Sequence, residues 1–287
     1  MPVTTDAHGG AVTSVSKSIL ELNFMSDKFA VVTGASSGIG LSLAKELASR
    51  GYDLLVCSAG ERLLEAAEVT RSYGTNVIAV TADLATREGV NLLWKTIADL
   101  GRPVDVACIN AGIGVGGQFW ETDLKQELTM VELNCSGTVH LAKHAVRHMR
   151  QLNSGKILFT SSIAGEMVAP REAVYAATKA FVLSFAHSLR YELRDTGITV
   201  TALQPGPTDT DFFHRAGMDG TQVGSEGKKQ SAPDDVAKDG LDALFAGKDH
   251  VYSHSAETKL EGAVANLVPG SVKASMHEKM AKPLSDK

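Results

Sequence analysis

The stretch TGASSGIG, residues 33–40, decides the fold, because it lies where a short apolar run ends and a helical pattern begins. The run FAVVT at 29–33 predicts a strand, and GIGLSLAKELASRG at 38–51 predicts a helix. The glycines between and within them permit a tight turn and a close approach of the backbone to a bulky group. The free N–H groups and the positive dipole end of the helix would then favour an anion such as a pyrophosphate.

The alternation of strand and helix continues to residue 206 without a linker. Continuous apolar strands that alternate with amphipathic helices are typical of βαβ units. The sequence therefore predicts an α/β fold of a single domain, with a doubly wound, mostly parallel sheet of Rossmann type and helices on both faces. Further strands are predicted at 52–57, 76–83, 104–112, 155–162, 198–206 and 250–253, and further helices at 61–73, 87–101, 122–150, 173–195 and 233–246.

The two ends of the chain differ from this core pattern. Residues 1–26 are polar and rich in Gly, Thr and Ser, which predicts a poorly ordered N-terminal extension. The domain itself is predicted over 27–287. Within it, 207–233 is rich in Gly, Asp, Lys and Ser and predicts a flap, while 257–287 predicts a C-terminal helical tail.

The composition excludes some classes of protein. Hydrophobic residues make up 44% of the chain and charged residues 21%, and the net charge of −5 argues against nucleic acid as a partner. No apolar stretch approaches the ~20 residues of a membrane span. The three cysteines show no C-x-x-C spacing and the N-terminus lacks a secretory pattern, so a cytoplasmic location is expected.

Small and polar residues also follow three other predicted strands. Asp83 follows the third strand, NAG at 110–112 follows the fourth, and two serines at 161–162 follow the fifth. The carboxyl ends of parallel strands meet at one edge of a sheet, and ligands bind in the crevice there. These residues therefore predict a cleft at that edge.

A tyrosine and a lysine lie four positions apart in the apolar helix VYAATKAFVLSF, residues 174–185. Residues at i and i+4 are neighbours on a helix surface, so Tyr175 and Lys179 would meet. A lysine held near a phenol favours the phenolate and lowers the pKa of the tyrosine. Taken alone, the pair is more ordinarily read as two long side chains that reach from an apolar face to solvent.

Together these motifs resemble the short-chain dehydrogenase/reductase family, in its compact single-domain branch. The resemblance covers residues 27–255, and the order and spacing of six motifs agree with the family. The six are TGASSGIG at 33–40, NAG at 110–112, Asn134 in ELNCSG, SSIAG at 161–165, YAATK at 175–179 and PGPTDT at 205–210.

The resemblance implies a hydride transfer between a nicotinamide and a ketone, an aldehyde or a secondary alcohol. It makes Tyr175 the general acid/base, and it makes Lys179 the residue that lowers the pKa of Tyr175 and holds the nicotinamide ribose. Ser162 would hydrogen-bond the substrate oxygen, and Asn134 would support a water chain that returns the proton. Outside the family, Ser162 would be a turn residue and Asn134 an unremarkable polar residue of a helix.

The resemblance also implies a set of cofactor contacts along the predicted cleft. Asp83 would contact the adenine, although it could equally cap the helix that follows it. Ile109 replaces an asparagine that the family usually carries, so local repacking is expected there. The implied contact residues are Gly34, Ser36, Ser37, Gly38, Ile39, Gly40, Ser58, Asp83, Leu84, Asn110, Ala111, Gly112, Tyr175, Lys179, Pro205, Gly206, Thr208 and Thr210.

The choice between NADP and NAD depends on the end of the second strand. An acidic residue there would bind a ribose 2′-OH and select NAD, but this chain has Ser58. Ser37 offers a hydroxyl to a 2′-phosphate, and Arg62 could reach one if its loop bends inward. The missing acid favours NADP over NAD on electrostatic grounds and leaves both open.

His140, His144 and His148 recur at every fourth position and could in principle hold a metal. Lys143 and Arg147 lie beside them and oppose a cation, so no metal is expected and a solvated or subunit-facing helix is the simpler interpretation.

The substrate is expected to be a small ketone, aldehyde or secondary alcohol of modest polarity. The predicted flap and the loop after NAG would line its pocket, with apolar contacts from Trp120, Phe212 and Phe213. The resemblance implies a homodimer or homotetramer. Two other functions stay open: a sensor that binds the cofactor without turnover, and a lyase or epimerase, for whose longer substrate domain the chain has little room.

Overall fold

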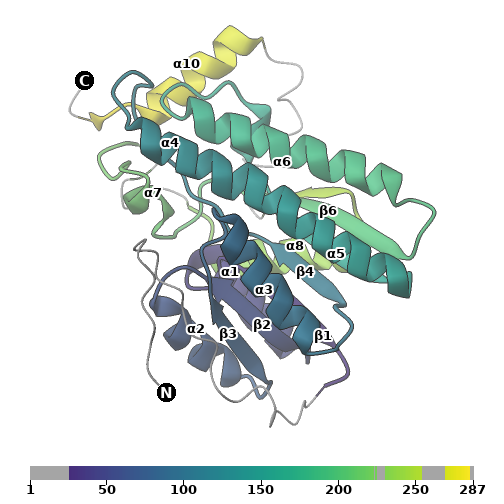
Figure 1. Ribbon diagram of the computed structural model, residues 1–287. Helices are drawn as coiled ribbons and strands as arrows, with labels where there is room; N and C mark the ends of the chain where they lie inside the picture. The colour runs from purple at the N-terminus through teal and green to yellow at the C-terminus, as the bar shows by residue number, and fades with distance from the viewer. Residues whose placement is uncertain (1–25, 223, 225–229, 254–268, 285–287) are drawn as a thin grey trace.

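A sheet of seven parallel strands forms the centre of the computed structural model, which describes residues 26–222, 224, 230–253 and 269–284 (Figure 1). Its order is β3-β2-β1-β4-β5-β6-β7, so the strand order reverses between β1 and β4. All the predicted strands are confirmed. They are β1 (Phe29–Thr33), β2 (Asp53–Ser58), β3 (Val77–Thr81), β4 (Val106–Ile109), β5 (Gly155–Thr160), β6 (Ile198–Gln204) and β7 (His250–Tyr252).

Helices cover both faces of the sheet, as the sequence predicts (Figure 1). Side chains of the central strands alternate between the two faces: Val31 belongs to one apolar cluster, and Ala30 and Val32 belong to the other. The first cluster includes residues of α3 (Arg87–Asp99), α5 (Thr138–Leu152) and α6 (Ala173–Glu192). The second includes residues of α1 (Gly38–Ser49), α2 (Arg62–Arg71) and α8 (Pro233–Phe245).

The helical region predicted over 122–150 is confirmed as a continuous helical stretch over residues 124–152, which contains a π turn that the sequence does not predict. A π-helical turn, Glu132–Gly137, separates α4 (Leu124–Val131) from α5. Within it Asn134 bonds to the backbone of Ile113, and a Cβ on Gly137 would come within 2.2 Å of the Leu84 carbonyl oxygen. The wider turn therefore brings this segment into close contact with the loops that follow β3 and β4.

The predicted flap and tail each contain a helix. The flap holds the short helix α7 (Phe212–Arg215), and the tail holds α10 (Gly270–Ala281). The tail residues 257–268 and the predicted N-terminal extension lie outside the described residues, except for Ser26, whose Oγ donates to the Gly51 carbonyl. Within the part of the chain that the structure describes, none of the helices has the length and apolarity to cross a membrane.

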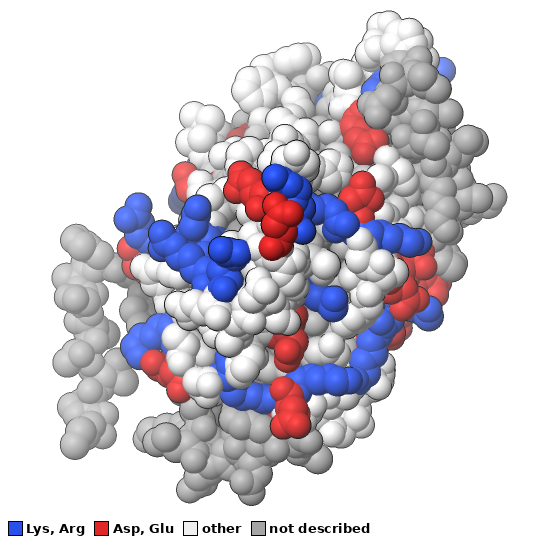
Figure 2. All heavy atoms as spheres, turned by 90° about the vertical axis from the view of Figure 1, so that its right-hand side faces the viewer, with Lys and Arg blue, Asp and Glu red and all other residues white. Residues whose placement is uncertain are grey.

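On the face that Figure 2 shows, basic and acidic side chains lie next to one another among uncharged ones. This mixed pattern differs from the continuous basic stripe that nucleic-acid binding favours.

One buried carboxylate ties four segments together at the amino end of the sheet. Asp53 is fully buried and accepts hydrogen bonds from the backbone N–H of Ser26 at 3.2 Å and of Asn76 at 3.1 Å. The guanidinium of Arg102, in the α3–β4 loop, donates to the same carboxylate at 3.0 Å. Asp53 therefore joins the starts of β1, β2 and β3 to the loop that precedes β4.

Replacement of Asp53 by Ala should lower the free energy of unfolding by about 3–5 kcal/mol, because the Arg102 guanidinium and two backbone N–H groups would lose this buried acceptor. Urea denaturation measures the change. Asp27→Ala is the matched control, since Asp27 is exposed, and it should change stability by less than about 0.5 kcal/mol. A loss below about 1 kcal/mol in Asp53→Ala would contradict the role assigned to this carboxylate.

Candidate active site

A cavity of about 770 Å³ opens at the carboxyl ends of the strands, where the sequence predicts a cleft. Its walls come from the loops that follow β1 to β6, together with the flap and α10. Of the predicted catalytic and cofactor-contact residues, only Asn134 is not part of the described wall. The others all line it: Gly34, Ser36, Ser37, Gly38, Ile39, Gly40, Ser58, Asp83, Leu84, Asn110, Ala111, Gly112, Ser162, Tyr175, Lys179, Pro205, Gly206, Thr208 and Thr210.

The glycine turn between β1 and α1 has no room for side chains. Gly34 and Gly38 have φ of 68° and 53°, a conformation that other residues rarely adopt. A Cβ on Gly40 would lie 2.1 Å from the Gly34 carbonyl oxygen. Ser37 is the N-cap of α1 but makes no side-chain cap bond, so the first N–H groups of the helix remain available beside the cavity.

The end of β4 is fastened to the end of β1. The Thr33 hydroxyl accepts hydrogen bonds from the backbone N–H of Asn110 and of Ala111, both at 3.0 Å, and the Asn110 amide donates to the Thr33 carbonyl at 3.0 Å. Ile109, which stands where the family usually has asparagine, is buried in the apolar core. These hydrogen bonds therefore hold the loop that carries NAG, although Ile109 replaces the asparagine that is usual in the family.

Tyr175 and Lys179 meet on α6 as predicted, and both are buried. The Lys179 ammonium lies 5.7 Å from the centre of the Tyr175 ring and donates to the Thr160 carbonyl at 3.0 Å. The Phe212 ring lies 5.2 Å from the Tyr175 ring, so the flap covers the phenol. The pair is thus enclosed in a region of low dielectric.

The expected lowering of the Tyr175 pKa by Lys179 is wrong for the chain by itself. Burial raises the pKa of Tyr175 above its ordinary value, the carboxylate of Glu172 raises it further, and a hydrogen bond with Ser162 opposes the rise. Burial also lowers the pKa of Lys179 to about 8. The phenol is therefore neutral across the physiological pH range.

Ser162 and Asn134 flank this pair in different ways. The Ser162 hydroxyl lies at the end of β5, in the cavity wall, and accepts from the Ala164 N–H at 3.1 Å. Asn134 is buried behind the wall, and its amide donates to the Ile113 carbonyl at 2.9 Å and to the Thr178 hydroxyl at 3.0 Å. Asn134 consequently stabilises the loop after β4 and the middle of α6.

The opposite end of the cavity is polar. The Ser58 hydroxyl donates to the Ser36 hydroxyl at 3.0 Å. Asp83 accepts from the Ala85 N–H at 3.0 Å, whereas Thr86 is the N-cap of α3. The alternative in which Asp83 caps that helix is therefore wrong.

Sequence reasoning missed several residues of the wall. Arg215 of α7 reaches across the cavity, and its guanidinium donates to the Ser37 hydroxyl at 3.3 Å. Glu172 and His277 form a buried pair with 2.8 Å between their oxygen and nitrogen atoms. Glu172 could have been noticed because it lies three positions before Tyr175, but nothing in the sequence connects His277 with it.

The predicted apolar contacts are only partly present. Phe212 and Phe213 line the cavity. Trp120 does not belong to the described wall, and 76% of its surface is exposed, so its prediction as a pocket residue is wrong.

Two side chains of the histidine stripe, His144 and His148, pack against Trp94 of α3. His144 stacks on Trp94 with 5.2 Å between ring centres, and the His148 ring approaches the same indole at 5.8 Å. His148 Nε2 also accepts from the Val104 N–H at 3.2 Å. His144 and His148 thus join α5 to α3 and to the loop that follows it.

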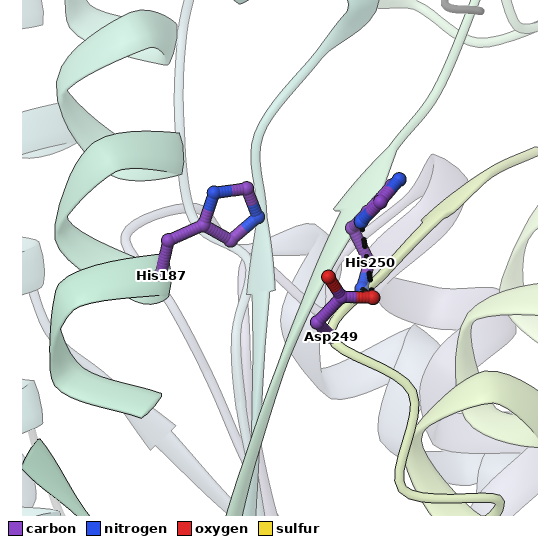
Figure 3. Close-up of side chains that lie close together, drawn as sticks. All are labelled: His187, Asp249 and His250. Atoms are coloured by element: carbon purple, nitrogen blue, oxygen red, sulfur yellow. Dashed lines mark hydrogen bonds and ion pairs between the residues drawn. The ribbon is translucent and has the colours of Figure 1, made fainter. Parts of the chain in front are cut away.

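A separate group of ionisable side chains lies at the outer edge of the sheet. His187 of α6, Asp249 and His250 place their donor atoms within 4.8 Å of one another (Figure 3). Asp249 Oδ1 lies 3.1 Å from His250 Nδ1, and His187 and Asp249 are exposed to solvent. The group shares no residue with the cavity.

Comparison with known proteins identifies the family. The model of the family described as short chain dehydrogenase matches residues 28–219, about two thirds of the chain. This chain is a short-chain dehydrogenase. An uncharacterized oxidoreductase of Staphylococcus epidermidis is 31% identical to the short-chain dehydrogenase described here, over 71% of this chain and 86% of the relative.

Two further comparisons agree with this membership. The 1-deoxy-11-beta-hydroxypentalenate dehydrogenase of Streptomyces exfoliatus is 35% identical over 79% of this short-chain dehydrogenase and 82% of the relative. The solved structure of a short-chain dehydrogenase from Sphingobium yanoikuyae in complex with NADPH is 28% identical, with a TM-score of 0.73 over 84% of this chain and 94% of the other.

The Lys179 pKa predicts a pH dependence of stability. In the folded chain this pKa is about 8, against an ordinary value of 10.5, so between these values the unfolded chain binds a proton that the folded chain has lost. The free energy of unfolding should therefore rise with pH across this window, relative to Lys179→Met, which carries no such group. Urea denaturation of both proteins without cofactor, at about pH 7.5 and pH 10, measures the difference.

Lys125→Met is the control, because it removes the same side chain at an exposed position outside the cavity wall. A difference between wild type and Lys179→Met that stays constant from pH 7.5 to 10 would refute the lowered pKa.

Proposed function

We propose that this short-chain dehydrogenase is a nicotinamide-dependent oxidoreductase that interconverts a ketone or aldehyde and the corresponding alcohol, with Tyr175 as the general acid/base. The observation that carries the proposal is the buried Tyr175–Lys179 pair, which lies with Ser162 in the wall of the same cavity as an uncapped helix start. The family membership and the NADPH complex of a structural neighbour support it.

The residues present suit a dinucleotide. The turn at Gly34, Gly38 and Gly40 leaves the backbone bare where a pyrophosphate would approach the start of α1. At Gly112 a Cβ would come within 3.1 Å of the Asn134 oxygen and within 3.3 Å of the Lys179 ammonium. A side chain at this position would therefore crowd Lys179 where a ribose would approach it. We infer that this wall holds the cofactor, which when bound supplies the hydride.

Tyr175 would supply the proton. Its raised pKa keeps the phenol neutral and able to donate to the oxygen of a bound carbonyl. The Ser162 hydroxyl would donate a second hydrogen bond to the same oxygen and orient it. Each donor then acts on the atom where negative charge develops, in a site from which water is largely excluded.

Lys179 would stabilise the tyrosinate that remains after the proton leaves. At 5.7 Å from the ring its positive charge attracts the phenolate, and this attraction grows in a buried site. Asn134 contacts the loop after β4 through the Ile113 carbonyl, and α6 next to this lysine through the Thr178 hydroxyl. We assign Asn134 a positioning role in the return of the proton from solvent.

Replacement of Tyr175 by Phe should lower kcat for carbonyl reduction by about 10²–10⁴-fold, because the general acid is lost. NADPH binding, followed by quenching of protein fluorescence, should change little. Tyr191→Phe is the matched control, since Tyr191 lies on the same helix with 68% of its surface exposed. If no ketone or aldehyde is turned over by the wild type although NADPH binds tightly, the sensor function replaces the reductase.

We further propose NADP rather than NAD as the preferred cofactor. Ser58 leaves no carboxylate at the end of β2 itself, and two arginines line this end of the cavity together with Glu61 and Asp83. Arg215 contacts Ser37, and Arg62 pairs with Asp211 at the edge of the same cavity. Both guanidinium groups could exchange these partners for a 2′-phosphate, with which arginine forms charge-assisted hydrogen bonds.

Arg215→Ala should therefore weaken NADPH binding by about tenfold or more, which corresponds to one charge-assisted hydrogen bond, and leave NADH binding nearly unchanged. Ser58→Asp should act in the opposite sense for selectivity, because a carboxylate repels the 2′-phosphate and accepts from a 2′-OH. Dissociation constants from fluorescence titration measure both effects.

Arg147→Ala removes one exposed charge outside the cavity wall and serves as control. Equal losses for NADPH and NADH would rule out selection by Arg215.

The substrate side is expected to accept an apolar skeleton, since Phe212, Phe213 and Met280 line it. The homodimer or homotetramer and the cytoplasmic location stay predictions from the sequence and the resemblance.

A further inference from the structure

The cavity has a polar contact at its substrate end that the reaction assigned to Tyr175 does not use. Glu172 and His277 both line the wall, and their residues are only 6% and 7% exposed. Glu172 Oε2 lies 2.8 Å from His277 Nε2. Removal of two ionisable groups from water is unfavourable unless the geometry compensates for it, so such a buried pair in the cavity wall requires an explanation.

The histidine comes from a segment beyond the residues that match the family model, which end at 219. It lies on α10, which crosses the amino end of α6 (Figure 1). Further contacts hold this helix: Lys273 donates to the Glu166 carbonyl at 3.1 Å, and Ala281 is buried in a cluster with Met218 of the flap. The attachment of α10 therefore does not depend on His277 alone.

The pair lies close to the reacting centre. Glu172 is the residue before α6 and precedes Tyr175 by three positions, about one helical turn or roughly 5 Å along the axis. Its carboxylate also raises the pKa of Tyr175. A substrate whose carbonyl is held by Tyr175 would thus pass the pair a few atoms farther along its skeleton.

The chemistry of the pair restricts what it can bind. An ionised carboxylate only accepts hydrogen bonds, and an imidazole beside it can donate one. A hydroxyl group both donates and accepts, so it can replace the direct Glu172–His277 bond by donating to the carboxylate and accepting from the imidazole. A substrate carboxylate would be repelled by Glu172, and an ammonium group could not accept from His277.

We propose that Glu172 and His277 form a second polar contact for the substrate, and that the preferred substrates are ketones or secondary alcohols with a further hydroxyl group roughly one helical turn (~5 Å) from the reacting oxygen. This inference rests on the proposed function and names its substrate class. His277 is then a specificity-determining residue supplied by the tail of the chain.

The test compares two substrates of similar size with NADPH as cofactor, 4-hydroxycyclohexanone and 4-methylcyclohexanone. For the wild type, the hydroxyketone should have a kcat/KM at least about tenfold higher, because its hydroxyl can hydrogen-bond to the polar pair and a methyl group cannot. His277→Phe, which keeps the size of the side chain without its hydrogen bonds, should reduce this preference to about onefold, mainly through a higher KM for the hydroxyketone.

Two further variants separate recognition from folding. His277→Gln keeps a hydrogen-bond donor and should retain part of the preference, and it also serves if His277→Phe does not fold. Glu278→Gln changes the exposed neighbour on α10 and should retain the full preference. Thermal unfolding and NADPH fluorescence titration show that each variant is folded.

The outcomes distinguish the two proposals. If the wild type reduces neither these ketones nor any other carbonyl compound, the proposed function fails and this inference fails with it. If the wild type reduces both ketones equally well, the reductase stands and the inference is overturned. A preference for the hydroxyketone that survives in His277→Phe, with only a lower Tm, would show that the pair merely attaches α10.

Discussion

The contact between the β1–α1 turn and the end of β4 is the constraint on which the cleft depends. A Cβ at position 40 would overlap the Gly34 carbonyl, so α1 can start only where glycine lets it touch its own turn. Thr33 then holds the backbone of Asn110 and Ala111 from the neighbouring strand. This contact lies at the reversal of strand order, where open α/β sheets bind their ligands.

Burial gives the opposite end of the cleft its chemical character. Within about one turn of α6, burial makes the phenol of Tyr175 a weaker acid and the amine of Lys179 a weaker base, because each group is removed from water. Both therefore differ from the same residues at a surface, before any ligand binds. The aromatic flap residue Phe212 contributes to that burial from a segment remote in sequence.

The sheet and the cleft could be predicted from the sequence because both depend on local patterns, namely apolar runs and the small residues that follow them. What could not be predicted depends on contacts between distant segments. The π turn that carries Asn134 follows from packing against two other loops, and the approach of Arg215 to Ser37 joins residues 178 positions apart. Trp120 looked like a pocket residue by its position after NAG, but side-chain direction in a loop has no such pattern.

The order of the strands also has a consequence for synthesis. β1 is the first described strand, yet one of its two neighbours is β4, and the hydrogen bond from Thr33 to the Cys108 carbonyl spans 75 residues. At ~5–20 residues per second, that edge of β1 waits roughly 4–15 s for its partner on the ribosome. An apolar strand with a free edge can pair with the wrong chain. The nascent protein is therefore vulnerable to mispairing until β4 has been synthesised and can pair with β1 beside the glycine turn.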